Sequence, residues 1–348
     1  VGEDLALPLL STLPRPGGQI KGTPEDFMVR EIPLYEPCGS GDHVYLCLLY
    51  RDENTQDVAR KLQKLFGLPA DGLGFAGMKD RNSISEQYFS LYLPGKDTAD
   101  VRTQIDAQFL PEHPGMELKM VSRHKNRLRR GHLAGNAFTI RLFNLAVPVD
   151  QALAAAEGIK AQLAESGYAN YYGLQRFGGR GDNAARGFSW LKGEFRPQKH
   201  LVDLLESSLQ SFVFNRWLAE RIGDGLFSQL LPGDVMRKIS SGGLFLAADL
   251  PLEQERLERR ETCYTGPLPG RKLKHPESEA RERESRLLAK LGLSDMPWRS
   301  DGGRRDARVH PGDFSIRAEE HALLFSFTLP AGSYATVVLR EFTGTDLR

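Results

Sequence analysis

Cysteine is scarce in this sequence, and the spacing of the few cysteines present excludes common cysteine chemistry. Cys38, Cys47 and Cys263 are the only three among 348 residues, and no two of them form a Cys-x-x-Cys pair. An odd, widely spaced set argues against both a disulfide framework and a cysteine zinc site. The sequence also has no His-Glu-x-x-His segment, so we expect no metal ion.

Long apolar runs and a basic N-terminus are also missing. No segment approaches the roughly 18 to 20 consecutive apolar residues that a membrane-spanning helix needs. Residues 1–4 include acids where a secretory signal needs a basic region, and prolines at positions 8, 14 and 16 interrupt the segment that follows. We therefore expect a cytoplasmic protein without a membrane partner.

Positive charge is not in excess, because 46 Lys and Arg residues face 45 Asp and Glu residues, a net charge of +1. The whole chain thus lacks the charge of a general nucleic-acid binder, and a polyanion site would have to come from local clusters. Three clusters are present: residues 123–130 with Arg127, Arg129 and Arg130, residues 271–274, and residues 304–308 with Arg304 and Arg305. Each cluster could equally be a solvent-exposed charged surface that binds no nucleic acid.

The expected elements divide the chain into a helix-rich middle and two β-rich ends. A length of 348 residues exceeds one ordinary core and favours two domains. Strands are expected at 42–50, 87–93, 135–143, 323–329 and 334–340. Helices are expected at 55–66, 150–167 and 201–222, and charged helical stretches within 250–293 are separated by residues 265–270. This order suggests a domain inserted into one that both termini build.

A glycine-rich loop around Asp80 carries the strongest chemical signal. The glycines of segment 72–77 allow sharp turns and the close approach of another molecule, and an aromatic strand follows. Lys79 and Arg81 flank Asp80 and favour its ionised form. An ordinary turn also favours Asp and Gly, so this stretch alone does not distinguish a turn from a site.

The same segment matches G-x-G-x-x-G, the pyrophosphate-binding pattern of Rossmann units. That pattern requires a strand before it and a helix after it. Here an amphipathic helix that Asn54 can cap comes before, and a strand comes after. We therefore exclude a nucleotide cofactor.

Two further segments combine aromatic and polar residues in a way that suits RNA. Asn136 and Phe138 share one face of an expected strand, where an amide can bond a base edge and a ring can stack on a base. Segment 170–182 interleaves aromatic residues and glycines with Arg176 and Arg180, which suits stacking and phosphate contact. A core position for Phe138 and a structural aromatic turn at 170–182 explain the same residues.

Five separated motifs together resemble the TruD family of pseudouridine synthases. In chain order they are Pro24-Glu-Asp-Phe27-x-Val29-x-Glu31, Gly77-Met-Lys-Asp80-Arg81, Gly135-Asn136-x-Phe138, Asn170-Tyr-Tyr-Gly-x-Gln-Arg-Phe-Gly178, and Leu329-Pro-Ala-Gly-Ser-Tyr-Ala-Thr336 with Arg340-Glu341. The resemblance covers nearly the whole chain in the family's order. It implies isomerisation of uridine 13 of transfer RNA to pseudouridine without any cofactor.

The resemblance also implies an α+β fold. A pseudouridine synthase catalytic domain with a mixed, mainly antiparallel sheet would be interrupted by an inserted TruD-specific, helix-rich α/β domain. We expect residues 1–152 and 305–348 to form the catalytic domain and residues 153–304 to form the inserted RNA-binding domain. No coiled-coil or other self-association seam is visible, so we expect a monomer.

By this resemblance, Asp80 occupies the position of the family's catalytic carboxylate. The residues expected at the uridine are Phe27, Lys79, Asn136, Phe138, Tyr334 and Lys21. The residues expected to contact RNA, from composition, are Arg127, Arg129, Arg130, Arg176, Arg180, Arg304 and Arg305. Pseudouridylation needs a carboxylate either as a nucleophile at ribose C1′ or as a base at C2′, and sequence does not choose between these roles.

A non-catalytic RNA-binding protein is the competing interpretation. It would explain the basic and aromatic segments, but it would leave the loop around Asp80 without a role.

Overall fold

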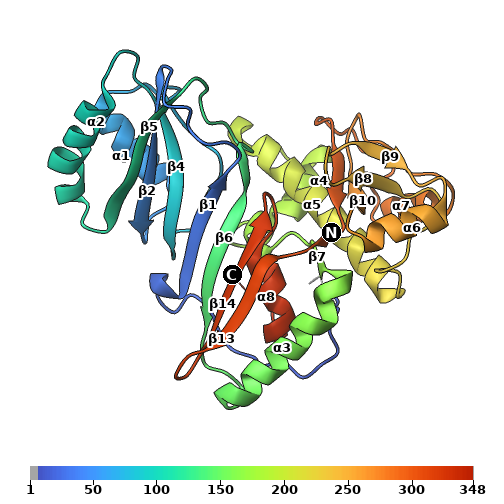
Figure 1. Cartoon of the computed structure of the whole chain (residues 1–348). Helices are drawn as coiled ribbons and strands as arrows, with labels where there is room; N and C mark the ends of the chain where they lie inside the picture. Colours follow the sequence, from blue (N-terminus) through green and yellow to red (C-terminus); the bar gives the residue numbers. More distant parts are fainter. Residues whose placement is uncertain (1–6, 348) are drawn as a thin grey trace. The chain divides into compact units, whose positions relative to one another are not determined.

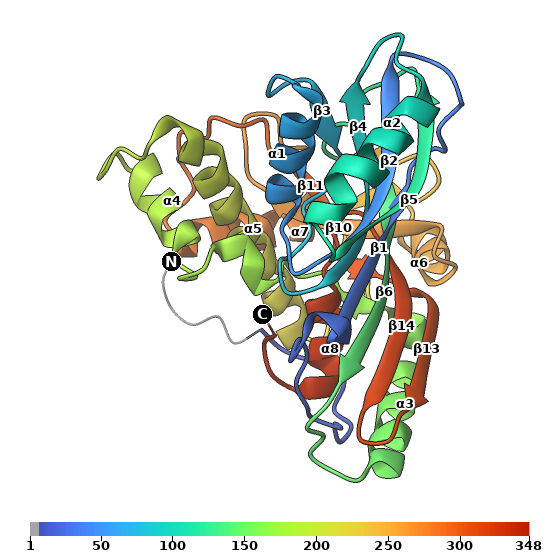
Figure 2. The same cartoon turned by 90° about the vertical axis from the view of Figure 1, so that its left-hand side faces the viewer.

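The computed structural model describes residues 7–347 and divides into two compact units (Figures 1 and 2). The first, here the sheet unit, comprises Pro16–Ala154 and Pro311–Gly332; the second, here the helical unit, comprises Ala155–His310 together with the described residues up to Arg15 and from Ser333 onward. The units differ from the predicted domains because both chain ends group with the middle of the chain. The predicted functional domains, 1–152 with 305–348 and 153–304, stay a prediction. The acidic residues 1–4 lie outside the described residues.

The sheet unit is built on an eight-stranded sheet in the order β13-β14-β6-β1-β4-β2-β5, with β3 added to β4. The strands are β1 Phe27–Pro33, β2 His43–Arg51, β3 Leu73–Phe75, β4 Ile84–Tyr92, β5 Met116–His124, β6 Leu133–Leu142, β13 Gly312–Ala318 and β14 Leu323–Pro330. All pairings in this sheet are antiparallel except that of β1 with β4. The expected mixed, mainly antiparallel sheet is confirmed.

Two helices, α1 Thr55–Phe66 and α2 Thr98–Gln104, lie against one face of this sheet near β2 and β5 (Figure 1). The Asn54 side chain accepts a hydrogen bond from the Asp57 N–H at 3.0 Å and begins α1. Gly67 ends α1 in the left-handed conformation with φ of 61°. Burial of the apolar face of α1 on β2 and β4 forms the core of this part of the unit.

The helical unit combines helices with two small sheets. The helices are α3 Val149–Ser166 (from Ala155 onward), α4 Asn183–Leu191, α5 Val202–Gly223, α6 Leu250–Glu258, α7 Ser278–Lys290 and α8 Ala335–Thr343. The strands are β7 Tyr168–Ala169, β8 Val235–Lys238, β9 Leu244–Leu246, β10 Thr262–Leu268, β11 Gly303–Asp306 and β12 Arg308–Val309. The four-stranded sheet has the order β11-β10-β8-β9, and β12 pairs with β7.

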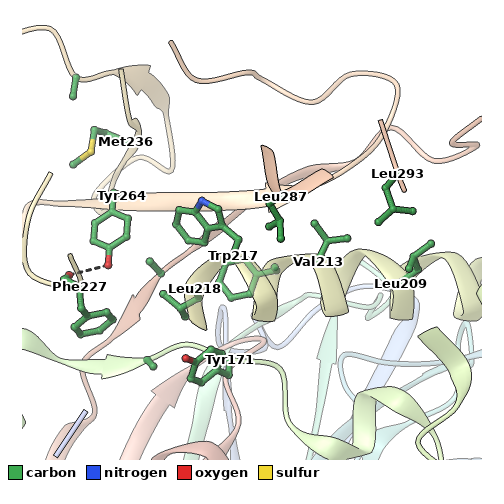
Figure 3. Packing of buried hydrophobic residues seen from close by; sticks show 14 of the residues in the cluster. Tyr171, Leu209, Val213, Trp217, Leu218, Phe227, Met236, Tyr264, Leu287 and Leu293 are labelled. Atoms are coloured by element: carbon green, nitrogen blue, oxygen red, sulfur yellow. Dashed lines mark hydrogen bonds between the residues drawn. The ribbon is translucent and has the colours of Figure 1, made fainter. Parts of the chain in front are cut away.

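The core of the helical unit lies where α5 packs on β10 (Figure 3). Trp217 and Val213 of α5 point toward the sheet, and the Tyr264 hydroxyl donates to the Phe227 carbonyl at 2.8 Å. A Cβ at Gly266 would lie 2.3 Å from the Trp217 ring, so only glycine permits this close packing. Burial of these large side chains holds the helix on the sheet.

One sequence expectation for this unit is wrong. Residues 334–340 were expected as a strand, yet they lie mostly in α8, where Ala335, Val338, Leu339 and Phe342 are buried on one helix face. Residues 265–270 lie between α6 and α7, and their first part belongs to β10, which occupies the centre of the four-stranded sheet. Pro267 is tolerated because it lies beyond the part of β10 that pairs with β8.

Candidate active site

The register of β1 and β6 places two rows of polar and aromatic side chains on one face of the sheet. Glu31 lies opposite Asn136, and Val29 lies opposite Phe138. Directly opposite residues of an antiparallel pair share a face, and so do residues two apart along a strand. The expectations that Phe27 shares a face with Val29, and Asn136 with Phe138, are therefore confirmed.

Aromatic rings form the floor of this face. The Phe27 and Phe138 rings meet edge to face with centroids 6.1 Å apart, and Phe138 lies 5.6 Å from the Phe327 ring of β14. Phe27 and Phe138 are both buried. Phe138 can therefore be both a core residue and a site residue. Its ring packs into the core from the same sheet face that carries the polar residues.

Asp80 lies in the loop between β3 and β4, and Lys21 is bonded to it. The Lys21 Nζ atom lies 2.6 Å from Asp80 Oδ2 and 4.5 Å from the centroid of the Phe27 ring. The Lys21 side chain is only 10% exposed, whereas that of Asp80 is 42% exposed. The carboxylate is accessible to a ligand while its cationic partner is held against the aromatic floor.

Both sequence neighbours of Asp80 have other polar partners. The Lys79 ammonium donates to Asn136 Oδ1 at 2.6 Å and lies 3.1 Å from Glu31 Oε2. The Arg81 Nε atom lies 3.5 Å from Asp52 Oδ1. Consecutive side chains of an extended loop point in different directions, so adjacency in sequence did not identify the cation that bonds Asp80.

Lys79 and Glu31 form a buried ion pair, with side chains 4% and 1% exposed. Burial lowers the pKa of Lys79, and the Glu31 charge opposes that shift. Gln87 of β4 donates from Nε2 to Glu31 Oε2 at 3.3 Å and to the Gly77 carbonyl at 2.7 Å. The pair is therefore held between β1, β4 and the Asp80 loop.

Thr55 connects this loop to the first turn of α1. Its hydroxyl accepts the Lys79 backbone N–H at 2.8 Å and donates to Gln87 Oε1 at 2.9 Å. Sequence reasoning missed Thr55 and Gln87, which carry no local signal. Glu31 could have been found, because it continues the alternation of Phe27 and Val29 and stands in a recognised motif.

The glycine-rich segment 72–77 is contacted by the chain itself. A Cβ at Gly74 would lie 2.2 Å from the Leu128 carbonyl oxygen, and the Gly131 N–H donates to the Ala76 carbonyl at 3.0 Å. The absence of a side chain at Gly74 lets the basic run pack directly on the backbone of β3. This glycine is explained without a nucleotide.

The predicted RNA-binding arginines of the sheet unit differ in exposure. Arg129 and Arg130 are exposed, whereas Arg127 is half-buried and donates to the Leu73 carbonyl at 2.5 Å. Arg129 and Arg130 are therefore accessible to a ligand, whereas Arg127 attaches the loop to β3.

In the helical unit, the segment 170–182 forms a structural aromatic cluster. The Arg305 guanidinium lies 3.9 Å from the Tyr172 ring centroid and bonds the Asn170 carbonyl and side chain at 2.9 and 2.7 Å. Arg176 lies 5.6 Å from the same ring and donates to Ser211 Oγ at 3.0 Å. Stacking partners for Tyr172 thus come from the chain itself.

The remaining predicted residues of the helical unit have separate environments. Arg180 is exposed, and Tyr334 precedes α8 with its ring edge to face on Tyr172 at 6.0 Å. Arg304 is buried and forms a two-point ion pair with Glu284 at 2.7 and 3.0 Å. The charge of Arg304 is thus compensated inside the unit, which argues against the predicted contact with RNA.

Comparison with known proteins gives a consistent match over nearly the whole chain. The family model described as tRNA pseudouridine synthase D (TruD) matches residues 7–198 and 196–342. The chain belongs to the TruD family. A TruD relative from Anaeromyxobacter sp. (strain Fw109-5), named tRNA pseudouridine synthase D, is 40% identical over 341 residues, which cover 94% of this chain and 93% of the relative. One of the same name from Thermus thermophilus is 40% identical over 336 residues, with 96% and 90% covered.

The fold of this TruD chain also matches a solved structure. A crystal structure from Methanosarcina mazei carrying the TruD name superimposes with a TM-score of 0.77 at 22% identity, over 99% of this chain and 97% of that one. Among residues 7–347, no three His, Cys, Asp or Glu side chains gather as a metal site would require. No helix in that range combines the length and apolarity needed to cross a membrane.

Proposed function

We propose that this protein isomerises uridine 13 of transfer RNA to pseudouridine, with Asp80 as the catalytic carboxylate. Its relatives carry the name tRNA pseudouridine synthase D and are 40% identical. The observation that carries the role of Asp80 is its accessible carboxylate, bonded at 2.6 Å to a Lys21 side chain that is itself largely buried. With 42% of its side chain exposed, the carboxylate is accessible to a ribose, and Lys21 restrains its orientation.

The reaction moves the uracil from N1 to C5 without net oxidation or reduction. In one route Asp80 attacks C1′ as the N1–C1′ bond breaks, and C5 of the turned base later displaces the carboxylate. In the other route Asp80 removes the C2′ proton, which expels the base and leaves a C1′–C2′ double bond; C5 then bonds C1′ while the protonated carboxyl returns the proton to C2′. In both routes a proton finally leaves C5, and the carboxylate is regenerated.

The aromatic floor supports the uridine during this exchange. A base that leaves its stack loses stacking energy, and the rings of Phe27 and Phe138 can restore part of it. Apolar rings beneath the base would also help to keep water from it while it is detached. The expected contact of Tyr334 with the uridine stays a prediction.

Transfer RNA would be held by exposed cations on both units. Arg129 and Arg130 in the sheet unit and Arg180 in the helical unit are exposed and can neutralise phosphates. Residues 153–304 would act as the RNA-binding insertion in a catalytic domain of residues 1–152 and 305–348. We expect the enzyme to work as a monomer in the cytoplasm, without a metal or nucleotide cofactor.

The position is tested with transfer RNA transcripts that carry uridine or cytidine at position 13. The purified protein should form pseudouridine at position 13 of the first transcript and none in the second, as mapped by mass spectrometry of nuclease fragments. Pseudouridine at another position, with uridine 13 unmodified, would contradict the assigned target. Tight binding without pseudouridine in either transcript would favour the non-catalytic RNA-binding protein.

A further inference from the structure

The hydrogen bond from Lys79 fixes which way the Asn136 amide faces. An ammonium group only donates hydrogen bonds, so the atom 2.6 Å from Lys79 Nζ must be the amide oxygen. The amide nitrogen, Nδ2, therefore points away from Lys79. An asparagine side chain is commonly ambiguous by a half-turn, but a cation on one side removes that ambiguity.

Lys79 is itself unable to move away easily. Its ammonium lies 3.1 Å from Glu31, whose carboxylate is almost fully buried and lies directly opposite Asn136 in the strand register. Withdrawal of Lys79 would leave a buried, uncompensated carboxylate, which is strongly unfavourable. The Lys79 backbone is also held by the Thr55 hydroxyl.

The Nδ2 group of Asn136 remains available as a donor. Asn136 is half-buried on the face that carries the aromatic floor. No hydrogen bond from its Nδ2 atom occurs within the described part of the chain, residues 7–347. A donor of fixed direction on a substrate-binding face is suited to a carbonyl oxygen.

Uracil has a symmetry that makes a fixed donor useful in this reaction. A half-turn of the ring about the line through N3 and C6 brings C5 to the place of N1, as the isomerisation requires. The same half-turn exchanges O2 and O4, so a carbonyl oxygen occupies the same place before and after. A reversed amide would instead place its oxygen against a carbonyl in both orientations.

We propose that Glu31 and Lys79 are positioning residues that hold the Asn136 amide so that it donates to a uracil carbonyl in both orientations of the turning base. This inference rests on the proposed function. It assigns the buried ion pair a task in the reaction: the same donor binds the base before and after N1 and C5 change places.

The test compares transfer RNAs that carry uridine, 2-thiouridine or 4-thiouridine at the target, because sulfur is the weaker hydrogen-bond acceptor. Single-turnover rates are measured for the unaltered protein and for the double variant Glu31→Gln with Lys79→Met. This variant removes both buried charges together and keeps similar volumes, which preserves the fold better than either single change. RNA affinity should stay unchanged, since neither side chain is exposed.

The unaltered protein should be slowed by each sulfur substitution, by about tenfold for a hydrogen bond of ordinary strength. In the double variant, whose amide direction is no longer fixed, the slowing should shrink to less than about threefold, a non-additive result that marks direct coupling. Slowing by only one of the two analogues, or equal slowing in both proteins, would overturn the inference. Failure of the unaltered protein to convert ordinary uridine would instead overturn the proposed function.

A second variant decides the matter should the double variant not fold. Asn136→Asp keeps an oxygen for Lys79 and replaces the donor by an acceptor of the same shape. We expect it to keep the RNA affinity and to lower the single-turnover rate on ordinary uridine by roughly 100-fold, because the new acceptor repels the carbonyl. A rate within threefold of the unaltered protein would refute the donor role.

Discussion

His310 is a half-buried histidine whose protonation opposes folding of the helical unit. Burial, together with the charges of Arg260 and Arg308, lowers the pKa of His310 from 6.5 to about 4. His310 is therefore protonated below about pH 6.5 in the unfolded chain but only below about pH 4 in the folded chain. By linkage, stability falls as the pH is lowered through this window and levels off below it, by at most about 3 kcal/mol for this group.

His310→Gln isolates this contribution from that of other titrating groups. The free energy of unfolding in urea should decrease between pH 7 and pH 4.5 by about 2 kcal/mol more in the unaltered protein than in the variant. The same decrease in both proteins would show that His310 has no part in the acid sensitivity.

The local residue pattern predicted much of the candidate site but not its pairings. Asp80 could be singled out from its loop and motif, and the shared face of Asn136 and Phe138 from strand alternation. The ion pair of Asp80 with Lys21 could not be predicted from sequence, because the two residues are 59 positions apart and only the fold brings them together. Adjacency suggested Lys79, whose ammonium serves Glu31 and Asn136 instead.

At the scale of elements, the start of α1 supports the loop that carries Asp80. The buried Thr55 hydroxyl holds the backbone N–H of Lys79, the residue before Asp80. Thr55→Val would leave that N–H without its partner, at a cost of about 1 to 3 kcal/mol, and would loosen the carboxylate. We expect the single-turnover rate on transfer RNA to fall by roughly tenfold, since small misplacements of a reacting group are costly.

Asn54→Ala is the matched control for this prediction. It removes the cap of the same helix turn and should cost about 1 kcal/mol of stability, but it leaves the bond between Thr55 and Lys79 in place. Its single-turnover rate should stay within twofold of the unaltered protein. Equal rates for the Thr55 and Asn54 variants would contradict the supporting role of Thr55.

Elements were predictable from sequence where local chemistry defines them. Both ends of α1 were found because Asn54 and Gly67 cap it. In contrast, α8 contains the β-branched run Val337-Val338, and its helical state depends on the burial of one face, which sequence alone did not reveal. The central place of β10 likewise depends on neighbours distant in the chain.

At the scale of the whole molecule, a net charge of only +1 makes RNA binding depend on where cations are exposed. Arg129→Ala with Arg130→Ala should weaken transfer RNA binding and reduce the slope of log Kd against log salt by about 2, one for each lost phosphate contact. The rate at saturating RNA should not change, because neither arginine belongs to the proposed reacting group.

Arg60→Ala with Lys64→Ala removes the same charge from the exposed side of α1. This control should leave the slope within about 0.5 of the unaltered value, because only phosphate contacts release counterions. Equal slopes for the two double variants would show that net charge, and not the basic loop, governs binding.

Charge runs were the least reliable guide at this scale. The run that begins at Arg304 predicted an RNA contact, yet Arg304 pairs with Glu284 inside the helical unit. A sequence shows neither the burial of an arginine nor its distant partner. The division into two units was predictable from the β-rich ends and helix-rich middle, although both chain ends group with the middle.

The role of Asp80 is tested most directly by release of tritium from transfer RNA labelled at uracil C5, with purified protein and no added cofactor. Asp80→Asn should lower the single-turnover rate by at least about 1,000-fold, as expected for loss of a nucleophile or base, while RNA affinity stays within threefold. Asp52→Asn, which removes a nearby exposed carboxylate paired with Arg81, should keep the full rate. Tritium release by the Asp80 variant within tenfold of the unaltered protein would contradict the assignment of Asp80 as the catalytic carboxylate.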